Sequence, residues 1–460
     1  MLPAQTPKDT TRSPMKIIED HLDDFFEQYG ATILRVRAAA DSRNLNSLDD
    51  IITLNGAPAE RANYVNREGY RHLDSAAVLL LKLLSESPKL TRETARRALI
   101  DGFFGNLEKT IASGEFNPAP VVASARKLIK AAPRDDGLYV FPVVFARSAK
   151  LSKFKIGPLR LVAKPLFEAE HADAMQREAS SDPESMRPML AEDWNKFLAG
   201  YDHLLIVEIN GFEAKMAWDV AQEAAEFFLN LIRMRFGFHA TDDIRLAGGF
   251  AWQERRSSLR IKPDGEFFFS SSRDWIGTHL DDRWAEAFDV DLSTFKHGLA
   301  SYAYWLTSGE KPESPVLERL RYTNRLLSEA YSEPHDAARL VRTTSALETI
   351  SMIHGSDKAH NLALAAANAG GWGDPHKAND IYDAIRNAYY WRSMVVHGDA
   401  PGDDDVRAAF LKVEPFLLDV FLGFLVLFVR IQNERPPQSV GSLRREVAKR
   451  LTLFFWNPNL

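Results

Sequence analysis

Residues 389–398 read Tyr-Tyr-Trp-Arg-Ser-Met-Val-Val-His-Gly and place Arg392 and His397 at the end of an apolar, helix-like stretch. Gly398 is the residue type that most readily adopts the left-handed conformation just beyond a helix. We therefore expect a helix from about His376 to Val396, with His397 at its C-terminus. The dipole of such a helix favours a protonated imidazole at this end.

Helix start and stop signals continue around this stretch, over residues 301–435. Pro315 and Asp336 open two helices before it, and Ser356 can cap a third that runs to Asn368. Helices joined by such short connections pack as a bundle. The C-terminal third is therefore expected to be a helical bundle.

The most apolar run of the chain, Phe416 to Val429, follows the helix that carries Arg392 and His397. We interpret Asp403–Asp405 as the cap of one long apolar helix that ends near Arg430. The run contains Asp419 and is too short for a membrane span, which needs about 20 apolar residues. The sequence predicts a buried helix and no membrane association.

The rest of the chain changes its hydrophobic period from region to region. Residues 15–136 show helical spacing, whereas residues 137–300 mix strand-like runs with one helix from Met216 to Phe236. The strand-like runs are Leu138–Phe145, Phe154–Val162, His203–Ile209, Ile244–Ile261 and Glu266–Phe269. Residues 1–14 are interpreted as a disordered tail and residues 436–460 as a basic amphipathic tail. The expected fold class is multidomain α+β, predominantly α, with residues 137–300 forming a sensor or regulatory domain.

The amino-acid composition excludes several types of functional site. The 460-residue chain has no cysteine, which excludes disulfide scaffolds, thiol nucleophiles and Cys-ligated metal centres, and fits a reducing cytoplasm. With 57 Lys and Arg against 63 Asp and Glu its net charge is −6, so it does not coat nucleic acid through bulk charge. Residues 301–435 are also acidic on balance. Phosphate binding there must use a local site or charge from elsewhere in the chain.

The residues around Arg392 and His397 carry a family resemblance. The matching positions are Tyr389, Arg392, Ser393, Val396, His397 and Gly398, with Ala346-Leu347-Glu348 on an upstream helix. On these residues, the stretch 301–435 resembles the HEPN superfamily, and particularly its Apea-like branch. The resemblance implies a bundle that forms a homodimer, with one RNA-cleaving cleft built from two arginines and two histidines. It also implies a role in bacterial anti-phage defence or as a toxin, although many catalytic members have Asn, Asp or His where this chain has Ser393.

Arg392 and His397 also suit RNA cleavage on chemical grounds. RNA supplies its own nucleophile, the 2′-hydroxyl, so a site needs a proton-transferring group and a cation that stabilises the phosphorane. Histidine titrates near neutral pH, and arginine keeps its charge and offers a planar fork to phosphate oxygens. We expect an endoribonuclease with Arg392 and His397 as catalytic residues and with no cofactor. Its products would be 2′,3′-cyclic phosphate and 5′-hydroxyl ends.

Neighbouring residues receive supporting roles. Arg392 could instead pair with Glu348 or Asp383 inside the bundle, and Glu348 is interpreted as a buried ion-pair partner rather than as a catalytic base. The predicted helix also carries Arg386, Asn387 and Ser393. The RNA-binding candidates outside the bundle are the basic residues Arg255, Arg256, Arg260 and Lys262. Neither an HExxH motif nor the spacing of another common metal site occurs, so no metal site is predicted.

The alternative to a nuclease is a non-enzymatic function. The bundle could be a non-catalytic dimerisation module that senses RNA or a nucleotide and holds phosphate through Arg392 and His397 without cleaving it. Ser393 and the acidic surroundings favour this alternative, and the intact Arg and His oppose it. In either case a phage or cellular trigger is expected to act on the N-terminal regions. A third alternative is a helical scaffold whose C-terminal tail binds a larger complex.

Overall fold

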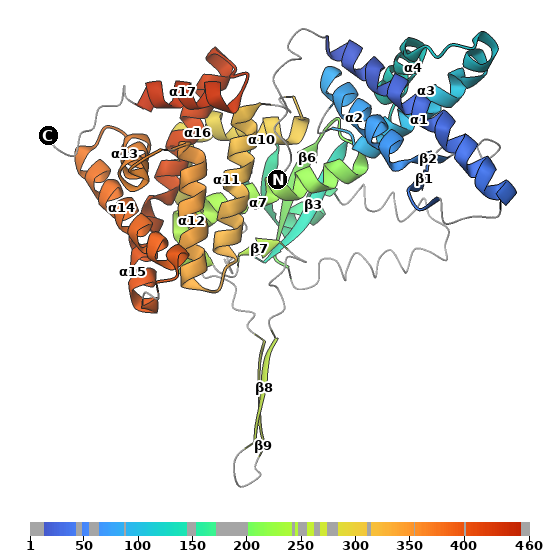
Figure 1. Cartoon of the computed structure of the whole chain (residues 1–460). Helices are drawn as coiled ribbons and strands as arrows, with labels where there is room; N and C mark the ends of the chain where they lie inside the picture. Colours follow the sequence, from blue (N-terminus) through green and yellow to red (C-terminus); the bar gives the residue numbers. More distant parts are fainter. Residues whose placement is uncertain are drawn as a thin grey trace. The chain divides into compact units, whose positions relative to one another are not determined.

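The computed structural model describes residues 13–42, 48–54, 64–86, 89–144, 153–171, 201–241, 244–246, 255–261, 267–273, 284–310, 314–353, 355–399 and 402–451 (Figure 1). It is predominantly helical, with a five-stranded antiparallel sheet in the middle region and an all-helical C-terminal segment, which confirms the expected fold class. Most of the predicted N-terminal tail lies outside the described residues, and the first helix begins at Pro14.

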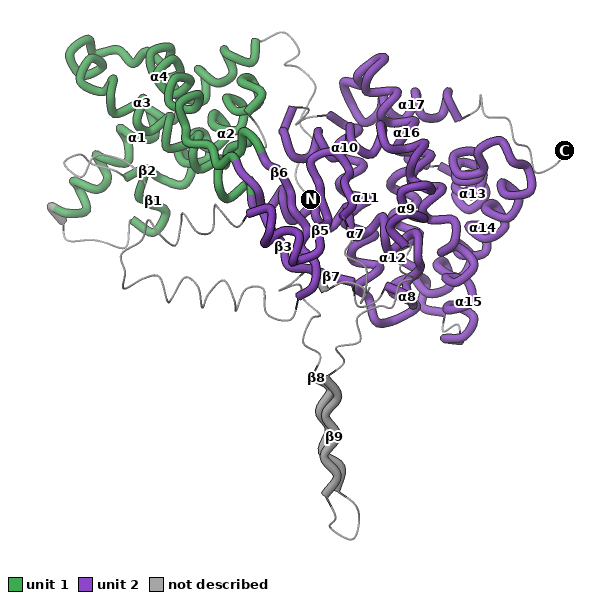
Figure 2. Tube along the Cα trace, turned by 180° about the vertical axis from the view of Figure 1, so that it is seen from behind, with its two compact units in different colours: residues 1–136, 210–217 green, residues 137–209, 218–460 purple. Residues whose placement is uncertain are grey.

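The chain divides into two compact units (Figure 2). Unit 1 comprises residues 1–136 and 210–217, and unit 2 comprises residues 137–209 and 218–460. Unit 2 therefore contains both the sheet and the C-terminal helices within one compact body.

Unit 1 is a small helical body with one short strand pair. Its elements are α1 (Pro14–Ser42), β1 (Ile51–Thr53), β2 (Tyr64–Asn66), α2 (Arg67–Leu83), α3 (Arg92–Ser113) and α4 (Pro118–Lys130). The side chain of Asn66 caps α2 by accepting from the backbone N–H of Gly69, which satisfies one of the orphan donors of the first turn. Phe25 of α1 and Phe103 of α3 meet edge to face in the core, with ring centroids 5.1 Å apart.

The sheet of unit 2 has the strand order β4-β5-β6-β3-β7, and all its pairs are antiparallel. Its strands are β3 (Gly137–Val144), β4 (Lys153–Ile156), β5 (Leu159–Ala163), β6 (His203–Ile209) and β7 (Arg245–Leu246). The predicted strand Phe154–Val162 is a hairpin, because Gly157 takes the left-handed conformation at φ 55° and turns the chain. A second pair, β8 (Arg255–Ile261) and β9 (Phe267–Arg273), forms a separate antiparallel hairpin.

One helix, α7 (Ala214–Phe236), joins the sheet to the C-terminal bundle. Phe228 of α7 meets Phe154 of the sheet with ring centroids 5.8 Å apart. The adjacent Phe227 meets Tyr302 of the bundle at 4.7 Å. Because residues 227–234 are buried without a break, α7 is apolar around most of its circumference, as a helix inside a core must be.

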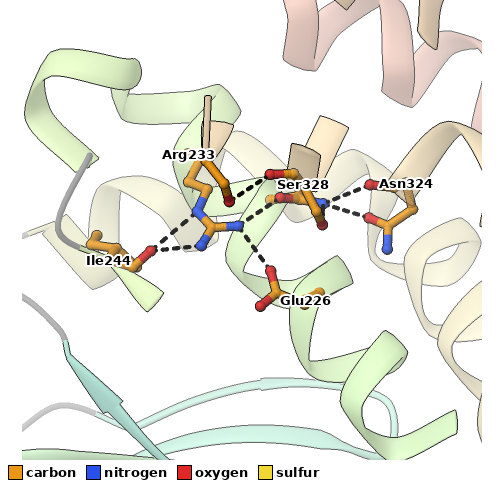
Figure 3. A network of polar contacts seen from close by, with 7 residues as sticks. Glu226, Arg233, Ile244, Asn324 and Ser328 are labelled. Atoms are coloured by element: carbon orange, nitrogen blue, oxygen red, sulfur yellow. Dashed lines mark hydrogen bonds and ion pairs between the residues drawn. The ribbon is translucent and has the colours of Figure 1, made fainter. Parts of the chain in front are cut away.

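Two polar residues of α7, Arg233 and Asn230, are also buried, and a hydrogen-bond network satisfies them (Figure 3). Arg233 donates to the carbonyl of Ile244 at 2.7 and 3.2 Å and to Asn230 Oδ1 at 2.9 Å. Asn230 in turn donates to Asn324 Oδ1 at 2.7 Å. The network fixes the bundle helix that carries Asn324 against α7 and against the backbone just before β7.

The C-terminal segment forms the bundle (Figure 1). Its elements are α9 (Trp284–Leu292), α10 (Lys296–Ser308), α11 (Pro315–Tyr331), α12 (Asp336–Ser351), α13 (Lys358–Gly370), α14 (Pro375–His397), α15 (Asp403–Val413), α16 (Leu417–Glu434) and α17 (Val440–Leu451), with the short α8 (Phe238–Thr241) after α7. α12 contacts α11, α14 and α15, while α13 contacts α14 and α16. The predicted C-terminal tail includes α17, which packs on this same bundle through the buried residues Leu443, Val447 and Leu451.

Two details of the bundle differ from the sequence prediction. Asp357, rather than Ser356, caps α13. The single long helix expected from Asp403 to Arg430 is two helices, α15 and α16, separated by a 3₁₀ turn at Glu414–Phe416. Pro415 lies in that turn and cannot donate the backbone hydrogen bond that a continuous helix needs.

The long apolar helix α16 is buried within the bundle, as predicted. Over the part of the chain that the structure describes, no helix combines the length and hydrophobicity of a membrane span.

Candidate functional site

The C-terminal end of α14 positions the two predicted catalytic residues. Asp374 caps its start and Pro375 occupies the first turn, where the missing N–H costs nothing. At the other end, the Gly398 N–H donates to the Val395 carbonyl and the next N–H donates to the Met394 carbonyl. Gly398 has φ 82°, so the helix ends in a Schellman motif directly after His397. The predicted helix end is confirmed.

Arg392 lies one and a half turns before this end and faces α12. Its Nη2 is 3.6 Å from Glu348 Oε2 in the last turn of α12, and the two side chains are only 22% and 24% exposed. The guanidinium also lies over the ring of Tyr389, 5.5 Å from the centroid. Among the described atoms, Arg392 Nε is buried without a hydrogen-bond partner, an arrangement that costs about 1–3 kcal/mol.

Glu348 is shared between two neighbours on α14. Burial, followed by the charge of Glu348 and a hydrogen bond to it, raises the pKa of the Tyr389 phenol. Tyr389 therefore stays protonated and can donate to the same carboxylate that pairs with Arg392. Of the two partners considered for Arg392, the structure places Glu348 beside it. The guanidinium is therefore held on the side that faces α12.

His397 lies on a different face of α14 from Arg392. The two are five residues apart, which corresponds to about 140° around a helix, and no hydrogen bond or ion pair joins them in the described part of the chain. His397 is exposed. One copy of the protein thus presents the arginine toward α12 and the histidine to solvent.

His397 belongs to a stripe of residues along α14. Arg386, Tyr390, Ser393 and His397 follow one another at i, i+4, i+7 and i+11, so they lie within about 60° of one another around the helix. Three of them are exposed and Ser393 is half-buried, while Asn387, on a neighbouring face, is also half-buried. The structure therefore groups Arg386 and Ser393 with the histidine rather than with Arg392. Tyr390, 55% exposed, was missed by the sequence analysis, although its heptad spacing from His397 is the signal that finds it.

The acidic residues after His397 have a structural explanation. Asp403, Asp404 and Asp405 form the first turn of α15 and are exposed. Carboxylates in the first turn are stabilised by the positive end of the helix dipole. These three negative charges nevertheless follow the end of α14 closely in the chain, and negative charge disfavours the binding of RNA.

The basic candidates of the middle region lie away from α14 in the chain. Arg255 and Arg256 begin β8 and Arg260 lies near its end, whereas Lys262 lies outside the described residues. The register pairs Arg260 with Phe268 of β9.

His360, another histidine of the bundle, has a local hydrogen-bond partner. His360 Nδ1 lies 2.7 Å from the hydroxyl of Tyr382, a hydrogen bond that ties α13 to α14. His354 lies outside the described residues.

Comparison with known proteins finds no family model, no curated protein and no solved structure that matches this chain.

Proposed function

We propose that the bundle is a metal-independent endoribonuclease that acts as a homodimer, with His397 transferring protons and Arg392 stabilising the phosphorane. The observation that carries the proposal is the end of α14, where an exposed histidine follows an arginine held by Glu348 at 3.6 Å. A cytoplasmic location belongs to the same proposal and rests on the absence of cysteine. A role in anti-phage defence or as a toxin rests on the resemblance of residues 301–435 to HEPN proteins.

The chemistry needs His397 in both protonation states. The neutral ring takes the proton of the RNA 2′-hydroxyl, whose oxygen attacks the adjacent phosphorus. A second, protonated histidine gives a proton to the departing 5′-oxygen, leaving a 2′,3′-cyclic phosphate and a 5′-hydroxyl. The exposed position of His397 lets the ring exchange protons with water.

A second copy accounts for the separation of the two residues. Since Arg392 and His397 point about 140° apart on one helix, a single chain does not direct both at one phosphate. The exposed stripe formed by Arg386, Tyr390, Ser393 and His397 offers a surface on which two α14 helices could meet. The cleft would then combine an arginine of one copy with a histidine of its partner.

The alternative of a non-catalytic, phosphate-binding dimer is favoured by a specific observation. Glu348 already pairs with Arg392, and the acidic Asp403, Asp404 and Asp405 follow α14 in the chain. In such a module Arg392 would exchange Glu348 for a bound phosphate without any proton transfer.

The test compares wild type with His397→Ala and Arg392→Lys after induced expression in a bacterial host, mapping new 5′-hydroxyl RNA ends. His335→Ala is the matched control, because His335 is another exposed histidine of the bundle. We expect new ends from wild type and from the control, and none from the His397 variant. A purified dimer that binds RNA but yields no cyclic-phosphate ends between pH 5 and 8 would support the binding module instead of the nuclease. A monomeric protein would contradict both the nuclease and the binding module.

A further inference from the structure

Three metal-ligating side chains converge in unit 1, far in sequence from α14. His21 and Asp24 are one turn apart on α1, and His72 comes from α2. The two Nδ1 atoms lie 3.2 Å apart, and His72 Nδ1 lies 3.3 Å from Asp24 Oδ2. The ligand atoms of all three residues lie within 4.8 Å of one another.

Hydrogen bonding alone leaves this cluster poorly satisfied. A neutral imidazole carries one proton, and each ring nitrogen is either a donor or an acceptor. If His72 Nδ1 carries its proton, this one proton must serve both His21 Nδ1 and the Asp24 carboxylate. If it does not, His72 Nδ1 presents a lone pair to the Asp24 carboxylate, which has no proton to donate.

A metal ion would accept all three lone pairs at once. Zn²⁺ binds imidazole nitrogen and carboxylate oxygen at about 2.0–2.2 Å, and the edge of that tetrahedron is roughly 3.3–3.5 Å. The 3.2 and 3.3 Å separations at His72 are close to that edge. Two imidazoles and a carboxylate are a donor set that Zn²⁺ and related divalent transition metals prefer.

We propose that His21, Asp24 and His72 form a binding site for a divalent transition metal, with Zn²⁺ as the best fit, and that the ion clasps α1 to α2. Three protein ligands leave the fourth position for water, and the Asp24 side chain, 54% exposed, opens the site to solvent. The site is separate from the proposed nuclease chemistry and does not depend on it.

The surroundings suit a clasp. Leu22 and Leu73, next in sequence to His21 and His72, are fully buried in the core of unit 1, so the backbone carrying both histidines is anchored.

The experiment measures Zn²⁺ binding to the full chain after chelator treatment, by calorimetry and by the shift in thermal midpoint. Co²⁺ provides a second probe, because its visible absorption reports tetrahedral nitrogen and oxygen ligands. We expect one Zn²⁺ per chain and a raised midpoint. His72→Gln, His21→Gln and Asp24→Asn should each weaken binding by about tenfold or more, the minimum seen for loss of groups that merely support ligands.

His297→Gln is the control, since His297 is an exposed histidine of α10 in unit 2. It should bind Zn²⁺ as wild type does. Asp24→Asn keeps the test decisive if a histidine variant folds poorly, because Asp24 is exposed. Wild type that binds no Zn²⁺, or binding that survives all three substitutions, would overturn the proposal.

Discussion

Arg392 Nη2 lies 3.6 Å from Glu348 Oε2, an ion pair between α14 and α12 whose two partners are both less than a quarter exposed. The pair limits where the guanidinium can point, and it leaves the Nε of the same group buried and unsatisfied among the described atoms. Arg392 is therefore held in place at a cost, and an anion that offered the missing acceptor would relieve it. This makes Glu348 a positioning residue for the proposed site.

Glu348→Gln is expected to lower the rate constant for RNA cleavage by about tenfold or more, because small misplacements of a catalytic cation are costly. Single-turnover kinetics on an RNA that the wild type cleaves measures it, with KM expected to change little. Glu348→Asp should restore part of the rate. Glu329→Gln, which breaks the exposed pair with Arg342 in the same bundle, is the control and should leave the rate unchanged. Equal effects of both glutamine variants would refute the positioning role.

Arg233→Met is expected to destabilise unit 2 by about 2–4 kcal/mol, because the carbonyl of Ile244 and the side chains of Asn230 and Glu226 lose a charged donor. Denaturant unfolding measures the change. Arg235→Met is the matched control two positions away. The pair of Arg235 with Asp291 is more than a third exposed, so its loss should cost less than about 1 kcal/mol. Similar costs for the two variants would contradict the network's role.

Gly423→Ala is expected to destabilise the bundle by about 3 kcal/mol, because the new Cβ would overlap the Ala369 carbonyl oxygen on α13. Gly298→Ala on α10 is the comparison. Its Cβ would meet only Val426 at 3.8 Å, an ordinary contact, and alanine favours the helix by roughly 0.5–1 kcal/mol. Thermal unfolding should move in opposite directions for the two variants, and a tolerated Gly423→Ala would show that α13 and α16 do not approach so closely.

The stability of the folded protein is expected to depend on pH through His203. Burial, only partly offset by Asp202, lowers the pKa of this β6 histidine from its ordinary value of 6.5. Below that value the unfolded chain takes up a proton that the folded protein resists, so this contribution to stability is complete above about pH 6.5 and is lost as the pH falls. The thermal midpoint should drop between pH 7.5 and pH 5.5, and His203→Phe should reduce the drop. If the thermal midpoint of the variant falls as much as that of the wild type, groups other than His203 cause the pH dependence.

The end of α14 shows how much the sequence predicted. Residues within a few positions of one another predicted that the helix ends near Val396, that Gly398 is left-handed and that His397 lies at the C-terminus. The same local rules located most of the bundle helices and the main strands. They did not predict the break at Pro415, because the apolar pattern between Asp403 and Arg430 continues across it. They also did not predict the turn at Gly157, because the two strands of that hairpin together have the composition of one strand.

The sequence by itself therefore determined the helices, the strands, the fold class and the residue types available for chemistry, because backbone hydrogen bonds and caps form between near neighbours. Tertiary structure alone decided which of the acidic residues near Arg392 pairs with it, namely Glu348 rather than Asp383, and that Asn230 meets Asn324. It also decided the meeting of His21 with His72, 51 residues apart, which the prediction of no metal site did not foresee. Such contacts depend on how the apolar faces of distant helices pack, and no local spacing in the chain encodes that packing.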